Sequence, residues 1–315
     1  MPHCPRPGVQ LALGLTLAAF AGAVVRTDGS ADSRPAVVPG AALPVVKIHT
    51  YTMAGRIRPL LFWIGRDRVG VARILWRRGA DGARGYELLI GTDPESAPRH
   101  LNRWGYIAEA GDGVRGSVLA LMSRSEESSI EEVGDRPKGS AEFKAMRAQV
   151  EAGVSSSVVP TVVVQNEPTF RDVEALIEQV RLAAERANVR TVSVPTGTRP
   201  GFLGAVAELV HSSVETLQDS AASAGGRPLS PVPYVYGTRL YDLSLRSHER
   251  CRTSRGGTGP ADGLARGRFE IRNRATGEVT RFELLYGLGG TLAEVPVEIV
   301  YQPRWWLKVE LRLNP

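Results

Sequence analysis

Apolar and polar residues alternate over several stretches of the chain, and the clearest of these stretches ends at Leu313. A period of two puts successive side chains on opposite faces of a strand, so one face packs on a core and the other meets water. The pattern predicts a C-terminal strand whose core face carries Trp305, Leu307, Val309, Leu311 and Leu313 and whose other face carries Arg304, Trp306, Lys308, Glu310 and Arg312.

The same pattern predicts two hairpins. Residues 69–76 place Ala72, Ile74 and Trp76 on one face, and a returning strand follows the turn signal GADG at residues 79–82. The second hairpin turns around residues 275–277. Predicted strands therefore cover residues 47–64 (broken or placed at an edge by Pro59), 69–76, 86–90, 114–122, 234–245, 269–272 and 278–286.

The middle of the chain has helical spacing at residues 140–152, 172–187 and 201–217. Short β-branched stretches at residues 158–164 and 189–194 flank the second of these, so a small βαβ insert is an alternative for this region. The predicted fold class is α+β: a curved, half-barrel-like antiparallel sheet made of N- and C-terminal strands, with helices from the central region packed on one face.

The N-terminal residues have the order of a secretory signal. Arg6 precedes an apolar run at residues 11–25, which contains the small-residue site Ala21-Gly-Ala23. We expect a signal peptide at residues 1–23, a flexible linker at 24–44 rich in Gly, Ala, Pro and Ser, and a single α+β domain at 45–315 with a possible internal boundary near 219–233. The expected location is periplasmic or extracellular, and a retained N-terminal anchor is the alternative.

Composition adds limits to this picture. The chain is 43% hydrophobic, which is enough for a real core, and no stretch after the signal is long and apolar enough to span a bilayer. Cys4 lies within the predicted signal, so Cys251 would have no partner for an internal disulfide.

The net charge of +6 is unevenly distributed. Residues 47–124 carry 13 basic and 7 acidic side chains, whereas residues 125–185 carry 6 basic and 12 acidic ones. The split could steer an anionic partner such as a lipid headgroup to one face, or reflect two oppositely charged surfaces that pack together or face water. We expect no nucleic-acid partner, because the basic residues alternate with apolar ones along strands.

Motifs for catalysis, cofactors or metals are absent. No GxSxG or phosphate-binding loop occurs, and His248 and Cys251 would give a metal only two ligands beside several arginines. We therefore predict no cofactor and no metal site. The carboxylates that could pair in a hydrolase only through the fold are Asp67, Asp93, Glu109 and Asp112, with His100 and His248 as further candidates.

Tryptophan and arginine give the most specific candidate site. The five tryptophans lie on or beside predicted strands, and four have an arginine within two residues. Their rings could hold an acyl chain and a guanidinium could hold its headgroup, although core packing is the alternative. The candidate ligand contacts are Trp63, Arg73, Arg103, Trp104 and Trp306.

Several segments resemble an uncharacterised family of exported bacterial proteins: residues 62–67 (FWIGRD), 69–74 (VGVARI), 102–106 (NRWGY), 281–286 (RFELLY) and 295–306 (VPVEIVYQPRWW). The closing strands also resemble envelope proteins with a curved half-barrel around helices, some of which carry lipids or lipoproteins. The resemblance implies an envelope location and no defined activity.

The function that we predict is non-enzymatic binding of an amphipathic ligand or an envelope component. The partner would be a lipid or an envelope protein. Two alternatives stay open at this point: a secreted hydrolase, and a structural or assembly protein of the envelope.

Overall fold

One curved sheet of 16 strands organises the molecule. The structure, a computed structural model, describes residues 43–58, 63–112, 115–123, 141–219, 228–251, 263–304 and 306–315. The predicted signal peptide, nearly all of the linker, Trp305 and the acidic run at residues 125–132 lie outside these ranges. The strands are β1 Val45–Ile57, β2 Ile64–Arg78, β3 Arg84–Thr92, β4 Trp104–Gly111, β5 Gly116–Ser123, β6 Ala141–Glu151, β7 Val154–Val158, β8 Thr161–Val164, β9 Arg190–Ser193, β10 Arg199–Pro200, β11 Val232–Tyr236, β12 Arg239–Cys251, β13 Leu264–Asn273, β14 Val279–Gly287, β15 Pro296–Arg304 and β16 Leu307–Leu313.

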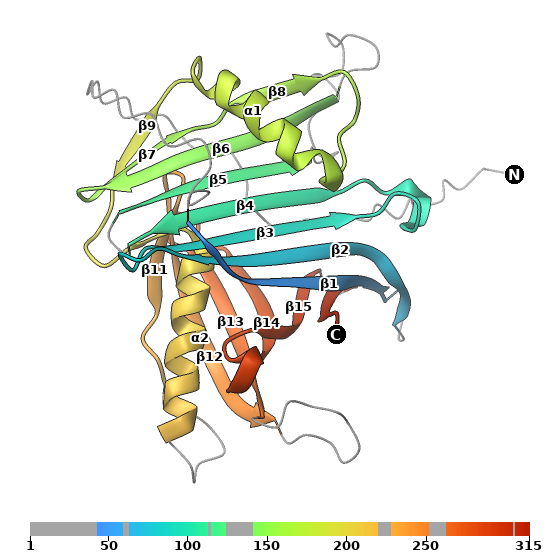
Figure 1. Cartoon of the computed structure of the whole chain (residues 1–315), viewed down its shortest axis with the longest axis vertical. Coiled ribbons are helices and arrows are strands. Elements are labelled where there is room, and N and C mark those ends of the chain that lie inside the picture. The colour runs from blue at the N-terminus through green and yellow to red at the C-terminus, as the bar shows by residue number, and fades with distance from the viewer. Residues whose placement is uncertain are drawn as a thin grey trace, which may run out of the picture.

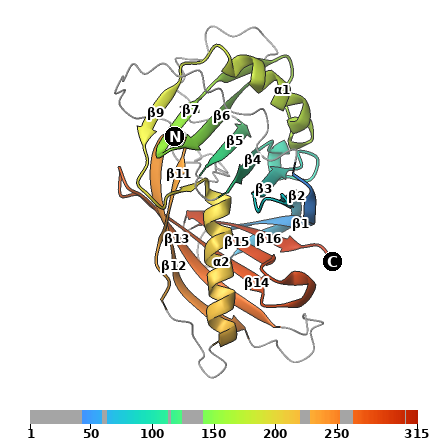
Figure 2. The same ribbon diagram turned by 60° about the vertical axis from the view of Figure 1, so that its left-hand side comes forward.

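The first and last strands of the described residues pair inside this sheet. β1 lies between β16 and β2 and is antiparallel to both, so the N-terminal strands continue directly into the C-terminal ones. Only the short pair β10–β11 is parallel among the named strand pairs of the described residues. Figures 1 and 2 show β2–β7 forming one half of the curved sheet and β11–β15 the other half, which confirms the predicted α+β class with a curved antiparallel sheet.

The two α-helices of the described residues, α1 Val173–Ala184 and α2 Phe202–Asp219, pack on opposite faces of the sheet. Leu176 and Val180 of α1 join a core with Tyr106 of β4, whereas Leu203 of α2 packs beside the core of Ile107, the next residue of the same strand. Neighbouring residues of a strand point to opposite faces, so α1 covers the outer face and α2 lies in the concave face. The expectation that the helices share one face is therefore wrong in this detail, because β4–β6 are apolar on both sides.

Predictions for the middle of the chain need two further corrections. Residues 140–152 form strand β6 instead of a helix. The βαβ insert is also absent from the described residues, because β7 pairs with β9 and β8 pairs with β6, both in antiparallel fashion. The described residues also contain three short 3-10 turns, η1 Pro98–His100, η3 Phe170–Asp172 and η4 Gly290–Leu292.

The hairpins and two of the helices appear where the pattern predicted them. β2 pairs with β3 and β13 with β14, and α1 and α2 cover most of the helical stretches at residues 172–187 and 201–217. No helix among the described residues combines the length and the apolar character that crossing a membrane would require.

Candidate functional site

A cavity of about 300 Å³ lies between α2 and the concave face of the sheet. Its walls come from both halves of the molecule, since β2 and β3 contribute residues together with β11–β16. Most of the lining side chains are aliphatic or aromatic. The concave face is thus hollow beside α2, where a fully packed core would leave no space of this size.

Helix α2 supplies one wall through an apolar stripe. Phe202, Val206 and Val210 recur every four residues, so they lie on one side of the helix and line the cavity together. The Phe202 ring also contacts Tyr234, with ring centroids 5.8 Å apart, and Phe282 at 5.9 Å. These aromatic contacts fix the start of α2 against β11 and β14.

Strands β2 and β3 supply the facing wall. Ile74 and Trp76 alternate on β2, and their cross-strand partners Leu88 and Tyr86 on β3 line the cavity with them. Trp76 is partly buried and meets the ring of His49 edge-on, with centroids 5.6 Å apart. The tryptophan at the cavity is therefore Trp76, whose face the alternation had predicted.

Basic side chains gather where the cavity reaches the ends of β1, β2 and β3. Lys47, Arg77, Arg78 and Arg84 belong to the lining, together with the acidic residues Glu278 and Glu294. Arg77 is neutralised by the buried Glu87, with 2.6 Å between Nε and Oε1. Glu294 pairs with His211 at 2.6 Å, and the carbonyl of the preceding Ala293 accepts a hydrogen bond from Nζ of Lys47 at 3.1 Å. Of the four basic residues in the lining, Lys47, Arg78 and Arg84 have no carboxylate partner among the ion pairs of the described residues.

Glu109 attaches α2 to the sheet. This β4 carboxylate is fully buried and accepts hydrogen bonds from the backbone N–H groups of Phe202 (2.7 Å), Leu203 (3.0 Å) and Gly204 (3.0 Å). It satisfies donors that the first turn of a helix leaves open, at the end where a negative charge is favoured. Burial raises the pKa of Glu109 to about 7, against the three N–H donors, which lower it.

Trp104 and Arg103 of the predicted site lie away from the cavity. Trp104 is buried on the outer face, where its Nε1–H donates to the carbonyl of Pro168 at 2.8 Å and its ring packs on Phe143 under α1. Arg103 precedes this strand and donates to the carbonyl of Asn102 at 3.0 Å.

The other three candidates lie elsewhere in the sheet, and two of them, Trp63 and Trp306, flank the end of β1, where the N–H of Arg58 donates to the carbonyl of Trp306 at 2.8 Å. Trp63 is 39% exposed just before β2, Arg73 points to the outer face of β2, and Trp306 is half-buried between β15 and β16. The structure therefore does not bring the five residues together, and none of them lines the cavity. A ligand role for them stays a prediction.

The carboxylates and histidines considered for hydrolysis also lie outside the cavity lining. Asp67 pairs with Arg56 at 2.7 Å, and Asp112 pairs with Arg115 at 3.2 Å. His248 is buried, and burial lowers its pKa. Within the described ranges no group of three or more His, Cys, Asp or Glu side chains could hold a metal ion.

Sequence reasoning missed the group of basic residues at the cavity and the role of Glu109. Arg78 and Arg84 flank the predicted turn at residues 79–82, so their closeness could have been read from the hairpin register. The approach of Glu109 to α2 has no such local signal, since 93 residues separate it from Phe202.

Comparisons with known proteins give one distant structural likeness. The chain is similar in structure to a beta-barrel-like protein of domain of unknown function DUF1849 from Brucella abortus, with 8% sequence identity and a TM-score of 0.44. The alignment covers 89% of this chain and 98% of that one. No protein-family model and no curated protein matches the sequence.

Proposed function

We propose that this chain binds an amphipathic ligand without transforming it, and that the cavity beside α2 holds the apolar part of that ligand. The observation that carries the proposal is the cavity itself: about 300 Å³ of space with a mainly apolar lining, inside a concave face that a helix only partly fills. Ligand sites in proteins are typically concave and apolar, with a few polar groups at fixed positions.

The size of the cavity narrows the ligand class. Its volume lies at the lower end of the range of roughly 300–1,000 Å³ for ligand pockets. One hydrocarbon chain or a similarly slender apolar body fits this space better than a ligand with several chains. Burial of each methylene group contributes about 0.8 kcal/mol, so a single long chain supplies enough free energy for binding.

The positions of the candidate catalytic groups support binding over hydrolysis. A general base must come within hydrogen-bond reach of its target. Asp93, in contrast, bonds to Ser96 at 3.0 Å and lies 3.6 Å from Arg171, outside the cavity lining. The carboxylate of Glu109 accepts hydrogen bonds from backbone N–H groups at the N-terminus of α2.

The proposal includes export. The N-terminal residues have the order of a secretory signal, and a binder of single-chain amphiphiles in the envelope would meet its ligand in or beside a membrane. Pulse labelling of the chain in a bacterial host, followed by fractionation and mass measurement of its N-terminus, tests this part. Mature protein outside the cytoplasm supports export, and an intact N-terminus confined to the cytoplasm contradicts it.

Blocking the cavity tests the binding site. Ala207 lies on the cavity side of α2, so Ala207→Trp places an indole in the space. Val71→Trp is the matched control, because Val71 lies on the outer face of β2 and is 41% exposed. Binding is measured by fluorescence with an uncharged long-chain probe on the full chain freed of co-purifying lipid.

We expect the wild type and Val71→Trp to bind the probe alike and Ala207→Trp to bind it at least about tenfold more weakly, a loss of roughly 1.4 kcal/mol. Equal binding by all three proteins places the probe elsewhere and contradicts the proposed site. Failure of the wild type to bind any long-chain probe contradicts the proposed function.

A further inference from the structure

We propose that the headgroup of the ligand is anionic, and that Lys47, Arg78 and Arg84 hold it at the rim of the cavity. This inference rests on the proposed function and names the chemical class of the ligand: a single hydrocarbon chain that ends in a carboxylate or a phosphate.

The first argument is the position of the three cations. Lys47 lies on β1 opposite Trp76, and Arg78 and Arg84 form the last cross-strand pair of the β2–β3 hairpin. All three belong to the cavity lining. A chain that lies against Trp76 and Leu88 would therefore carry its end group to these cations.

The second argument is the cost of placing two like charges opposite each other. Side chains in register on neighbouring antiparallel strands have Cβ atoms roughly 4.5–5.5 Å apart, and like charges there destabilise the pair. Arg78 and Arg84 are both exposed, and they face each other in this register. An anion bound between them would replace repulsion with two charge-assisted contacts.

A third argument comes from Tyr86 and Arg77. The Tyr86 hydroxyl lies close enough to Arg84 and Arg78 that both guanidinium groups lower its pKa, although burial raises it more. The two cations thus converge on a group that lines the cavity. Arg77, the neighbour of Arg78, pairs with the buried Glu87 and so provides an internal contrast. Among the ion pairs of the described residues, neither Arg78 nor Arg84 has such a carboxylate partner, so a bound anion would take that place.

The acidic side chains at the cavity do not cancel this rim. Glu294 is engaged by His211, which also lies 3.3 Å from Glu215. Glu278, from the turn between β13 and β14, is the second acidic residue of the lining, against the three cations Lys47, Arg78 and Arg84. The lining therefore carries four basic and two acidic side chains, and the basic ones all come from β1–β3.

Carboxylates and phosphates share the chemistry that arginine recognises, so a matched set of chains separates the sources. The test measures binding of hexadecanoate, hexadecyl phosphate, hexadecanol and hexadecyltrimethylammonium to the full chain, below the concentrations at which they form micelles. The double variant Arg78→Gln/Arg84→Gln is compared with Arg186→Gln/Arg190→Gln, which makes the same charge change at exposed positions that do not line the cavity.

We expect both anions to bind roughly tenfold or more tightly than hexadecanol to the wild type and to the control variant, with a preference that shrinks at high salt. The rim variant should lose this preference and keep its affinity for hexadecanol. The anion that loses more affinity in the rim variant identifies the headgroup that the site recognises.

The inference is overturned if the rim variant still prefers the anions over hexadecanol, or if the trimethylammonium chain binds as well as the anions. In either case, binding of hexadecanol still supports the proposed function. Absence of binding by all four chains overturns the proposed function itself. Unfolding in urea checks the fold of the rim variant: removal of the like-charge pair should leave its midpoint equal to or above that of the wild type.

Discussion

The carboxylate of Glu109 on β4 accepts the backbone N–H of Phe202 at 2.7 Å and thereby joins the N-terminal half of the sheet to the first turn of α2. The same residue, Phe202, begins the apolar stripe that lines the cavity. The position of the cavity wall therefore depends on a buried charged contact between segments that lie far apart in sequence.

Removing the carboxylate should destabilise the fold. Glu109→Gln keeps the shape of the side chain, but its amide nitrogen cannot accept a hydrogen bond, so at least one backbone N–H of α2 loses its partner. At pH 8 we expect a loss of about 1–3 kcal/mol in the free energy of unfolding, measured by urea titration. Glu249→Gln, at an exposed position, is the control and should change it by less than about 0.5 kcal/mol. Equal stability of both variants would contradict this role of Glu109.

The same carboxyl should make stability depend on pH. Its pKa is about 7 in the folded chain and near the ordinary value of 4.5 in the unfolded chain, so between these values the folded state binds more protons. The free energy of unfolding should therefore fall as the pH rises from about 4.5 to about 7, by up to about 3 kcal/mol, and then level off.

His248 also titrates near this window, with the opposite sign, because burial lowers its pKa. The quantity to measure is therefore the difference between wild type and Glu109→Gln in urea titrations at several pH values. A difference that grows toward low pH supports the protonated, buried carboxyl. Parallel curves of unfolding free energy against pH for the two proteins would show that Glu109 has the same pKa in the folded and the unfolded chain.

Gly201 should tolerate no side chain. It adopts a φ of +108°, and a Cβ atom there would lie 2.3 Å from the carboxyl carbon of Glu109. Gly197 is a matched control, with a φ of +81° and open space around the corresponding position. Gly197→Ala should cost only the backbone strain of about 1–2 kcal/mol, and Gly201→Ala at least about 2 kcal/mol more. Similar unfolding midpoints for the two variants would rule out the predicted clash.

Much of the sheet could be predicted from the sequence, because strands with one covered face alternate cleanly. The β2–β3 hairpin and β16 are of this kind, and β16 carries Val309 inward and Glu310 outward. The prediction of a helix at residues 140–152 was wrong for a physical reason. Phe143 packs under α1 on the outer face and Met146 on the concave face, so apolar residues on both sides of β6 mimic helical spacing.

The candidate site was less predictable. The alternation correctly placed Trp76 on the same face as Ile74. The cavity that this face lines, however, forms only because α2 and β11–β16 come from distant parts of the chain. Trp104 looked similar in sequence and is instead covered by α1. Composition identified the residue types of the site, and only the tertiary arrangement distinguished the cavity from the packed outer face.

The two tryptophans should therefore respond differently to substitution. Trp76→Leu removes a ring from the cavity and should weaken long-chain probe binding by roughly three- to tenfold with little change in stability. Trp104→Phe removes the hydrogen bond to Pro168 and should lower the free energy of unfolding by about 1–2 kcal/mol while probe binding stays unchanged. The reverse pattern would favour the outer face as the ligand site.

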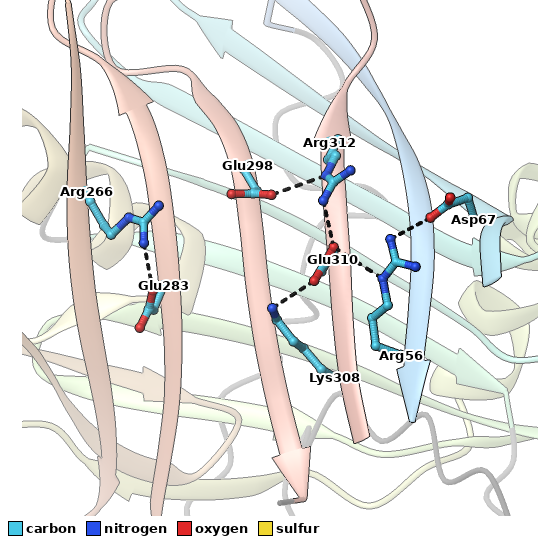
Figure 3. A network of polar contacts seen from close by, with 8 residues as sticks. All are labelled: Arg56, Asp67, Arg266, Glu283, Glu298, Lys308, Glu310 and Arg312. Atoms are coloured by element: carbon cyan, nitrogen blue, oxygen red, sulfur yellow. Dashed lines mark hydrogen bonds and ion pairs between the residues drawn. The ribbon is translucent and has the colours of Figure 1, made fainter. Parts of the chain in front are cut away.

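The outer face is held by a chain of ion pairs across β15, β16, β1 and β2 (Figure 3). At its centre the buried Glu310 contacts Lys308 at 2.8 Å, Arg312 at 2.9 Å and Arg56 at 3.7 Å. Burial acts to raise the pKa of Glu310, but the cations outweigh it and hold the pKa below its ordinary value.

Glu310→Ala should destabilise the chain by about 1–2 kcal/mol in urea unfolding, because three partly exposed cations lose a common partner. Glu283 of β14 is the control, because it belongs to a separate ion pair with β13, is 39% exposed and lies 3.3 Å from Arg268 (Figure 3). Glu283→Ala should cost less than about 1 kcal/mol. A larger loss for Glu283→Ala than for Glu310→Ala would contradict the ranking by burial.

The most direct test of the cavity as the ligand site is a crystal structure of the full chain with a hexadecanoate that carries bromine at its chain end, located by anomalous scattering. The account predicts a bromine peak between Val206 of α2 and Leu88 of β3, with the carboxylate toward Arg78 and Arg84. A bromine peak on the outer face, with the space beside α2 closed by side chains, would contradict it.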